Sequence, residues 1–360
     1  MSEQAIELTD SAGAISRPLR SSPSASAGAE ARRRSDLATA AGRGAVARDL
    51  VLGSDPESLA LLGVAEESTL QADVLRWQGS VLRERGQTAE AEQRYTRSLK
   101  LAQDLDYLAG QAHAVNLLAA IAQRRGELQR AGQLFQAAQR MAEGCGDRQL
   151  GGMIRQNRGI VSDICGDFDA ALAHYAESLH AFEATGDVRS MTLVLNNLGL
   201  LQVKTGRFPE ARRSYDRALE LARERGDLLC EGVIEENAAE LEMLRGDISA
   251  ACESITRALE LAAIRKDPLR RAAGLKLLAV SMRLSGRASD ALDPLTTAVE
   301  LAREGEDALL IGEILYETGL AHSCANAPVA AHEAWNEALR IFERIGATMM
   351  ANRVRDALSG

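Results

Sequence analysis

The sequence has few aromatic residues, few prolines and almost no lysine. Phe, Trp and Tyr make up 3% of its 360 residues, although 46% of the chain is hydrophobic. Alanine and leucine therefore carry the apolar share, which favours closely packed helices over sheets. Only seven prolines occur, and Pro209 and Pro268 stand where helices are expected to begin. The composition predicts an all-α protein.

The five cysteines and five histidines show no spacing that indicates a disulfide framework or a metal site. The cysteine count is odd and contains no CxxC pair, so we expect buried, reduced thiols. No apolar run approaches the ~20 residues of a membrane span. The acidic N-terminus also lacks the apolar core of a secretory signal. We expect a cytoplasmic protein with no metal, no cofactor and no membrane association.

The charge pattern and the missing motifs argue against nucleic-acid binding and catalysis. The net charge is −9, and no Gly-Lys dipeptide exists to form a phosphate-binding loop. Nucleic acid could bind only through the Arg-rich residues 17–48, where a solvated tail is the favoured interpretation. No Ser-His-Asp or Cys-His arrangement is indicated, and the adjacent carboxylates Glu235 and Glu236 are interpreted as ordinary helix-face charges. We therefore expect no enzyme activity.

What the chain does have is a 40-residue repeat in a single register. A turn residue, a small residue and a large residue recur seven times each. The turn positions are Gly86, Gly126, Gly166, Gly206, Gly246, Gly286 and Asn326. The small positions are Ala91, Ala131, Ala171, Ala211, Ala251, Ala291 and Ala331. The large positions are Tyr95, Phe135, Tyr175, Tyr215, Ile255, Leu295 and Trp335. Seven helix A–turn–helix B units that stack on one another are predicted.

The repeat divides the chain into four segments. We predict a disordered Ser/Ala/Arg-rich tail at 1–35, degenerate N-terminal capping helices at 36–67, seven repeats at 68–346, and a capping helix at 347–360.

The joints between repeats carry their own signals. Gly146, Gly186 and Gly226 suit the left-handed conformation that ends a helix. Aspartates that follow are expected to cap the next helix A; they are Asp147, Asp187, Asp227, Asp267 and Asp307.

A second small residue recurs inside helix A. These residues are Gly79, Ala119, Gly159, Gly199, Ala239, Ala279 and Gly319. We expect them to face Ala91 and its equivalents on helix B, while the large residues fill the gap to the next helix. This row is interpreted as packing rather than as a site.

The repeat resembles the tetratricopeptide signature. Residues 196–222 are similar to the family consensus at Leu198-Gly199, Gly206, Ala211, Tyr215 and Ala218-Leu219. The resemblance covers about 68–345 and implies a right-handed superhelical solenoid of about seven helix-turn-helix repeats with helical caps. The unit is 40 residues long rather than 34, which is similar to repeats of bacterial regulators and peptide sensors.

The resemblance also implies a binding surface, because in this family helices A line a concave groove. The frame places these candidate partner-binding residues there: Arg76, Asn116, Gln156, Asn157, Asn196, Asn197, Lys204, Glu236, Asn237, Lys276, Arg283 and Tyr316. Amides suit a peptide backbone, and the Arg and Lys side chains could take carboxylates. Alternatively, the asparagines solvate the groove or bridge neighbouring repeats. Packing of Tyr316 against the capping helix is favoured over stacking on a ligand.

Three functional hypotheses remain. The first is a non-catalytic adaptor that holds a protein or peptide segment in the groove, with self-association as a further possibility. The second is a regulatory sensor, in which a small peptide or metabolite binds the groove and modulates a transcriptional or signalling partner. The third is a nucleic-acid-associated regulator that works through the Arg-rich segment.

Overall fold

The computed structural model describes residues 69–359, and these residues are entirely helical. They form fifteen α-helices and contain no strand. The predicted tail at 1–35, the predicted caps at 36–67 and the Arg-rich residues 17–48 lie outside this range. The prediction of an all-α, tetratricopeptide-like helical solenoid is confirmed for the described residues.

The helices alternate between an A and a B position. The A helices are α4 (Thr69–Glu84), α6 (Leu108–Arg124), α8 (Arg148–Ile164), α10 (Val188–Lys204), α12 (Leu228–Arg245), α14 (Pro268–Leu284) and α16 (Ala308–Cys324). The B helices are α5 (Thr88–Asp104), α7 (Leu128–Cys145), α9 (Phe168–Thr185), α11 (Phe208–Arg225), α13 (Ile248–Arg265), α15 (Leu292–Glu304) and α17 (Pro328–Arg344). Helix α18 (Thr348–Ser359) follows the last pair.

Helix α15 begins about four residues later in the frame than the other B helices. Pro294 lies in its first turn. Proline has no N–H with which to bond the carbonyl four residues earlier, and its ring clashes with that carbonyl. A turn therefore replaces the first helical turn at 288–291.

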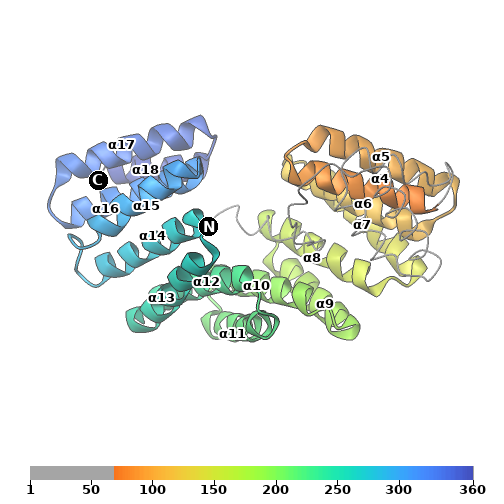
Figure 1. Cartoon of the computed structure of the whole chain (residues 1–360), viewed down its shortest axis with the longest axis horizontal. Coiled ribbons are helices and arrows are strands. Elements are labelled where there is room, and N and C mark those ends of the chain that lie inside the picture. Colours follow the sequence, from red (N-terminus) through yellow and green to blue (C-terminus); the bar gives the residue numbers. More distant parts are fainter. Residues whose placement is uncertain (1–68, 360) are drawn as a thin grey trace, which may run out of the picture. The chain divides into compact units, whose positions relative to one another are not determined.

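Contacts divide the chain into two compact units, with the boundary inside α10, between Val194 and Leu195. In the first unit α4 packs on α5, α6 on α7 and α8 on α9 (Figure 1). In the second unit α12 packs on α13, α14 on α15 and α16 on α17, and α18 lies against α17. Each helix A is thus paired with the helix B that follows it in the sequence.

The turns between helices take the predicted left-handed conformation. Gly86 and its glycine equivalents have φ between 73° and 82°, and Asn326 has φ 57°. At the joints between repeats, Gly146, Gly186 and Gly226 are left-handed C-caps as expected. All five predicted aspartate caps are confirmed, because each carboxylate accepts a hydrogen bond from the N–H three residues later.

At the glycine positions, the small residue of helix A meets the large residue of helix B in the same repeat. A Cβ added to Gly199 would lie 2.4 Å from the Tyr215 ring. The corresponding distances are 2.5 Å from Gly79 to Tyr95 and 2.2 Å from Gly319 to Trp335. The large residues also pack towards the next helix, as predicted, because Tyr95 shares an apolar cluster with Ile121 of α6.

The seven small–large pairs follow one volume rule. Glycine is present wherever helix B carries tyrosine or tryptophan, and alanine wherever it carries phenylalanine, isoleucine or leucine. The pairs are Gly79–Tyr95, Ala119–Phe135, Gly159–Tyr175, Gly199–Tyr215, Ala239–Ile255, Ala279–Leu295 and Gly319–Trp335. Because protein interiors are close-packed, the larger rings require the missing methyl group. The repeat core is thus set by pairs of positions 16 residues apart.

Three of the joints between repeats carry side chains where glycine would fit better. Asp106, Lys266 and Glu306 have φ 50°, 54° and 56°, at positions equivalent to Gly226. A non-glycine residue in this conformation costs on the order of 1 kcal/mol. We expect Lys266→Gly to raise the free energy of unfolding by about 0.5–1 kcal/mol in urea denaturation. Arg265→Gly, one residue earlier inside α13, should lower it by about 1 kcal/mol. A loss of stability in both variants would contradict this assignment.

The prediction that the cysteines are buried is wrong for most of them. Cys145, Cys165 and Cys324 are exposed near helix ends, and only Cys230 is buried. No group of three metal-binding side chains is present within 69–359. None of the described helices is long and apolar enough to cross a membrane.

Candidate partner-binding site on the helix A face

The predicted site residues lie on successive A helices, and we call the surface they belong to the helix A face. The first unit contributes Arg76, Asn116, Gln156 and Asn157. The second unit contributes Asn196, Asn197, Lys204, Glu236, Asn237, Lys276, Arg283 and Tyr316. The two groups are described separately below.

Asparagines bridge neighbouring A helices in both units. Asn157 Nδ2 donates to Asn116 Oδ1 at 3.1 Å, and Asn237 Nδ2 donates to Asn196 Oδ1 at 2.8 Å. Both pairs are 41 residues apart, so the same bond links α6 to α8 and α10 to α12. These bonds match the alternative in which asparagines bridge repeats. Each amide uses only part of its hydrogen-bonding capacity in this way, and the buried Gln156 Nε2 has no acceptor among the described residues.

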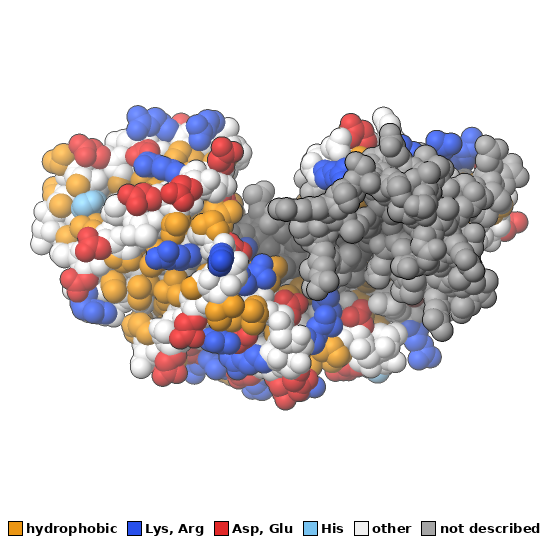
Figure 2. Space-filling model, viewed as in Figure 1, with side chains coloured by type: hydrophobic (Ala, Val, Ile, Leu, Met, Phe, Trp, Pro, Cys, Tyr) orange, Lys and Arg blue, Asp and Glu red, His pale blue; other side chains and the backbone are white. Residues whose placement is uncertain are grey.

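Three of the four predicted cations of the helix A face are paired with carboxylates of the same chain, and the fourth, Lys204, is exposed. Lys276 Nζ lies 2.5 Å from Glu313, Arg283 lies 2.8 Å from Glu317, and Arg76 lies 2.9 Å from Asp73. A ligand carboxylate would have to displace these partners. In the part of the second unit visible in Figure 2, side chains of opposite charge lie next to one another.

The pKa of Lys276 reflects this pairing. Burial opposes the charge of the ammonium group, but Glu313 and Glu240 outweigh it, and the pKa is raised above the usual lysine value. Lys276 is therefore a fixed cation that links α14 to α16, and it is not a candidate base.

Glu236 is a buried acid of the helix A face with a raised pKa. Its side chain is 11% exposed and its carboxylate lies 3.1 Å from Arg270 of α14. Burial raises the pKa of Glu236 to about 7, although Arg270 and Lys276 act to lower it. The ion pair joins α12 to α14. The Glu236 carboxyl is half protonated near neutral pH.

The raised pKa of Glu236 makes stability depend on pH. The unfolded carboxyl releases its proton near pH 4.5 and the folded one near pH 7, so the folded state binds more protons between these values. This group therefore lowers the free energy of unfolding as the pH rises through that window, by up to about 3 kcal/mol. We expect Glu236→Gln to exceed wild type in stability at pH 8 but not at pH 4.5, measured by denaturant titration. Glu224→Gln, on the surface of α11, serves as the control. An identical pH profile for Glu236→Gln and wild type would refute the assignment.

Tyr316 packs at the end of the second unit, as favoured from the sequence. The guanidinium of Arg353 in α18 lies 5.2 Å from the centre of the Tyr316 ring, a cation–π distance. The Tyr316 carbonyl accepts a hydrogen bond from Trp335 Nε1 at 3.2 Å. The ring is half-buried, so packing does not cover it completely.

Helix α12 carries a group of buried carboxylates that the sequence did not predict. Glu231, Glu235 and Glu242 are only 2%, 4% and 2% exposed, so the interpretation of Glu235 and Glu236 as ordinary surface charges is wrong. Arginines from both neighbouring B helices neutralise them. Arg223 of α11 contacts Glu231 at 3.1 Å and Glu235 at 2.6 Å, while Arg257 of α13 contacts Glu231 at 3.0 Å.

The repeat frame contained a signal for these buried acids. The positions equivalent to Glu235 are apolar in all but one of the other repeats, namely Leu75, Val115, Leu195, Leu275 and Leu315. The exception is Arg155, which contacts Glu143 at 3.1 Å and Glu177 at 3.0 Å. Glu143–Arg155 and Arg223–Glu235 are the same pair with the signs reversed, 80 residues apart. Charges at a core position of the frame indicate that a buried ion pair replaces apolar packing.

Stacked antiparallel helix pairs with a polar helix A face define a helical repeat scaffold. The tetratricopeptide repeat family matches residues 156–224. No curated protein matches the sequence. This match includes residues 196–222, whose resemblance to the tetratricopeptide consensus was predicted from the sequence.

Solved structures share the fold at low sequence identity. The apo form of the quorum sensor NprR from B. thuringiensis aligns with a TM-score of 0.67 at 13% identity, over 88% of this chain and 87% of that chain. Aspartyl phosphate phosphatase F from Bacillus subtilis gives 0.61 at 9%, over 90% and 96%. A signal transduction ATPase with a tetratricopeptide repeat sensor from Pyrococcus horikoshii gives 0.62 at 14%, over 93% of this chain and 56% of that one.

Proposed function

We propose that the protein is a non-catalytic adaptor that binds a protein or peptide segment on its helix A face. The observation that carries the proposal is the set of amides on this face, which include the bonded pairs Asn116–Asn157 and Asn196–Asn237. Asn116, Asn157 and Asn196 are buried, so Asn237, which is half-buried, is the member of these pairs whose remaining amide groups a partner reaches. The adaptor works by presenting this row to an extended segment.

Internal ion pairing supports a peptide rather than a highly charged ligand. Lys276–Glu313 and Arg283–Glu317 leave little net charge on the A helices of the second unit. Such a surface recognises a backbone and polar side chains without long-range attraction, so binding should depend weakly on salt. The free thiols support a reducing, cytoplasmic location for this function.

A regulatory sensor is the second candidate. Two structural neighbours are the quorum sensor NprR and a signal transduction ATPase with a tetratricopeptide repeat sensor. In this chain, Glu236–Arg270 and Lys276–Glu313 join successive A helices. A small ligand that competes for one of these pairs would change how those helices are held together, which supports coupling between binding and conformation.

A charge-swap variant tests the adaptor proposal without breaking an ion pair. Lys276→Glu/Glu313→Lys keeps the pair but reverses its polarity. We would capture proteins from native cell extract with wild type, with this variant, and with the control Arg217→Glu/Glu220→Arg on the exposed surface of α11. We expect a protein that wild type and the control retain and the variant loses. Equal retention by all three would remove the second unit's helix A face as the site. If no protein is retained, the sensor alternative is favoured.

A further inference from the structure

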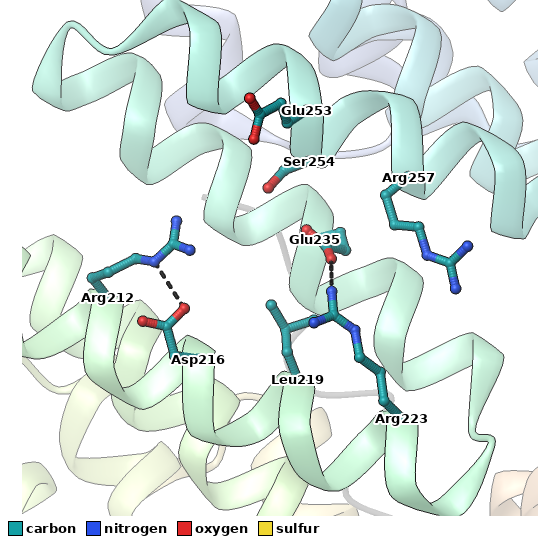
Figure 3. Close-up of a pocket in the computed structure, with 8 residues that line it drawn as sticks. All are labelled: Arg212, Asp216, Leu219, Arg223, Glu235, Glu253, Ser254 and Arg257. Carbon is teal, nitrogen blue, oxygen red and sulfur yellow. Dashed lines mark hydrogen bonds and ion pairs between the residues drawn. The ribbon is translucent and has the colours of Figure 1, made fainter.

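A pocket lies on the opposite side of α12 from the helix A contacts, between the two B helices α11 and α13. Its volume is about 280 Å³. In Figure 3, Glu253 and Ser254 of α13 face Arg212 and Asp216 of α11 across the cavity. Leu219 contributes an apolar wall from α11. The pocket is separate from the proposed adaptor surface.

The arginines that line this pocket are already engaged. Arg212 donates to Asp216 at 2.8 Å and to the buried Glu242 at 3.0 Å. Arg223 and Arg257 are held by the buried carboxylates described above. Their positive charges are matched by carboxylates of the chain itself, so they do not form an anion site.

The groups that remain available are acceptors. Glu253 is exposed and forms no ion pair with any described residue. Ser254 lines the cavity beside two carboxylates (Figure 3). Asp216 uses one carboxylate oxygen on Arg212, and no described side chain takes the other.

We propose that this pocket binds an organic ammonium group carried on a short aliphatic chain. An ammonium group has three N–H donors and no acceptor, which matches the acceptors on Glu253, Ser254 and Asp216. The alkyl part would lie against Leu219. The lining charges of three arginines and three acids cancel. Behind them, the buried Glu242 is also paired with Arg245, so the buried Glu231 leaves one net negative charge. The local field therefore favours a cation.

The same chemistry could come from a free diamine or from a lysine side chain of a partner. Isothermal titration of the full-length protein with putrescine and with N-acetyl-lysinamide distinguishes these sources, and n-butanol serves as the uncharged control. Low ionic strength is required, because salt screens a partly exposed pair. We expect at least one amine to bind and n-butanol not to bind.

Glu253→Gln is the test variant because Glu253 is exposed and unpaired, so the fold does not depend on it. We expect amine binding to weaken about tenfold, since hydrogen bonds to charged groups are worth about 1.5 kcal/mol or more. Glu220→Gln, which removes an equal charge from the far surface of α11, should bind as wild type does. Equal affinity in all three proteins, or no binding of either amine to wild type, would overturn the proposal. Neither result would bear on the helix A face.

Discussion

Replacing Gly199 by alanine is expected to lower the free energy of unfolding by about 2–3 kcal/mol, because one methyl group would be forced into a filled core. The new Cβ would lie 2.4, 2.7 and 2.8 Å from three atoms of the Tyr215 ring. Tyr215 is fully buried, so the ring cannot move into solvent. Overpacking of this kind costs about 1–3 kcal/mol. Urea denaturation followed by circular dichroism measures the change.

The repeat frame supplies both the rescue and the control for this experiment. Gly199→Ala/Tyr215→Leu recreates the natural Ala279–Leu295 combination and should be more stable than Gly199→Ala alone. Gly132→Ala in α7 adds a methyl group with no atom within 4 Å. It should be neutral or stabilising by up to about 1 kcal/mol. If Gly199→Ala were as stable as Gly132→Ala, the small–large pairing rule would be wrong.

The second large effect is expected at the buried acids of α12. Arg223→Met removes the cation that contacts both Glu231 and Glu235, and Glu235 then lies buried without its ion pair. Loss of one partner of a buried pair costs about 3–5 kcal/mol. Because Arg223 is itself 53% exposed, we expect a smaller loss than this range, about 2–3 kcal/mol.

A double variant separates the ion pair from the packing around it. Arg223→Met/Glu235→Leu places leucine where Leu75, Leu195, Leu275 and Leu315 stand in other repeats. Buried ion pairs can be replaced by apolar residues at little cost or with a gain. We expect the double variant to recover most of the stability lost in Arg223→Met. A double variant less stable than the single one would show that the network is needed for more than charge balance.

The repeat period made the architecture predictable, because its signals are local. The left-handed turn at Gly206 and the cap at Asp187 depend on residues within a few positions of each other. The A and B helices and their order along the chain follow from these signals. The direction in which Tyr215 packs was not predictable in the same way. The short distances from Gly199 to the Tyr215 ring show that the ring lies over helix A of its own repeat.

The pairing of charges was the least predictable part of the candidate site. The frame places Lys276 and Glu236 on the helix A face, but it does not show that Glu313 and Arg270 reach them from the next repeat. Long side chains adopt many rotamers, so sequence spacing alone does not fix their partners. A row that was expected to offer free cations is instead largely neutralised within the chain, and most of its amides are buried.

Hydrogen exchange measured on the full chain, free and bound to the protein it captures, tests the central claim most directly. If the helix A face is the binding surface, amides in α12, α14 and α16 should exchange more slowly in the complex, while those in α11, α13 and α15 should change little. Protection confined to α11, α13 and α15 would contradict the account and place the partner on the B helices.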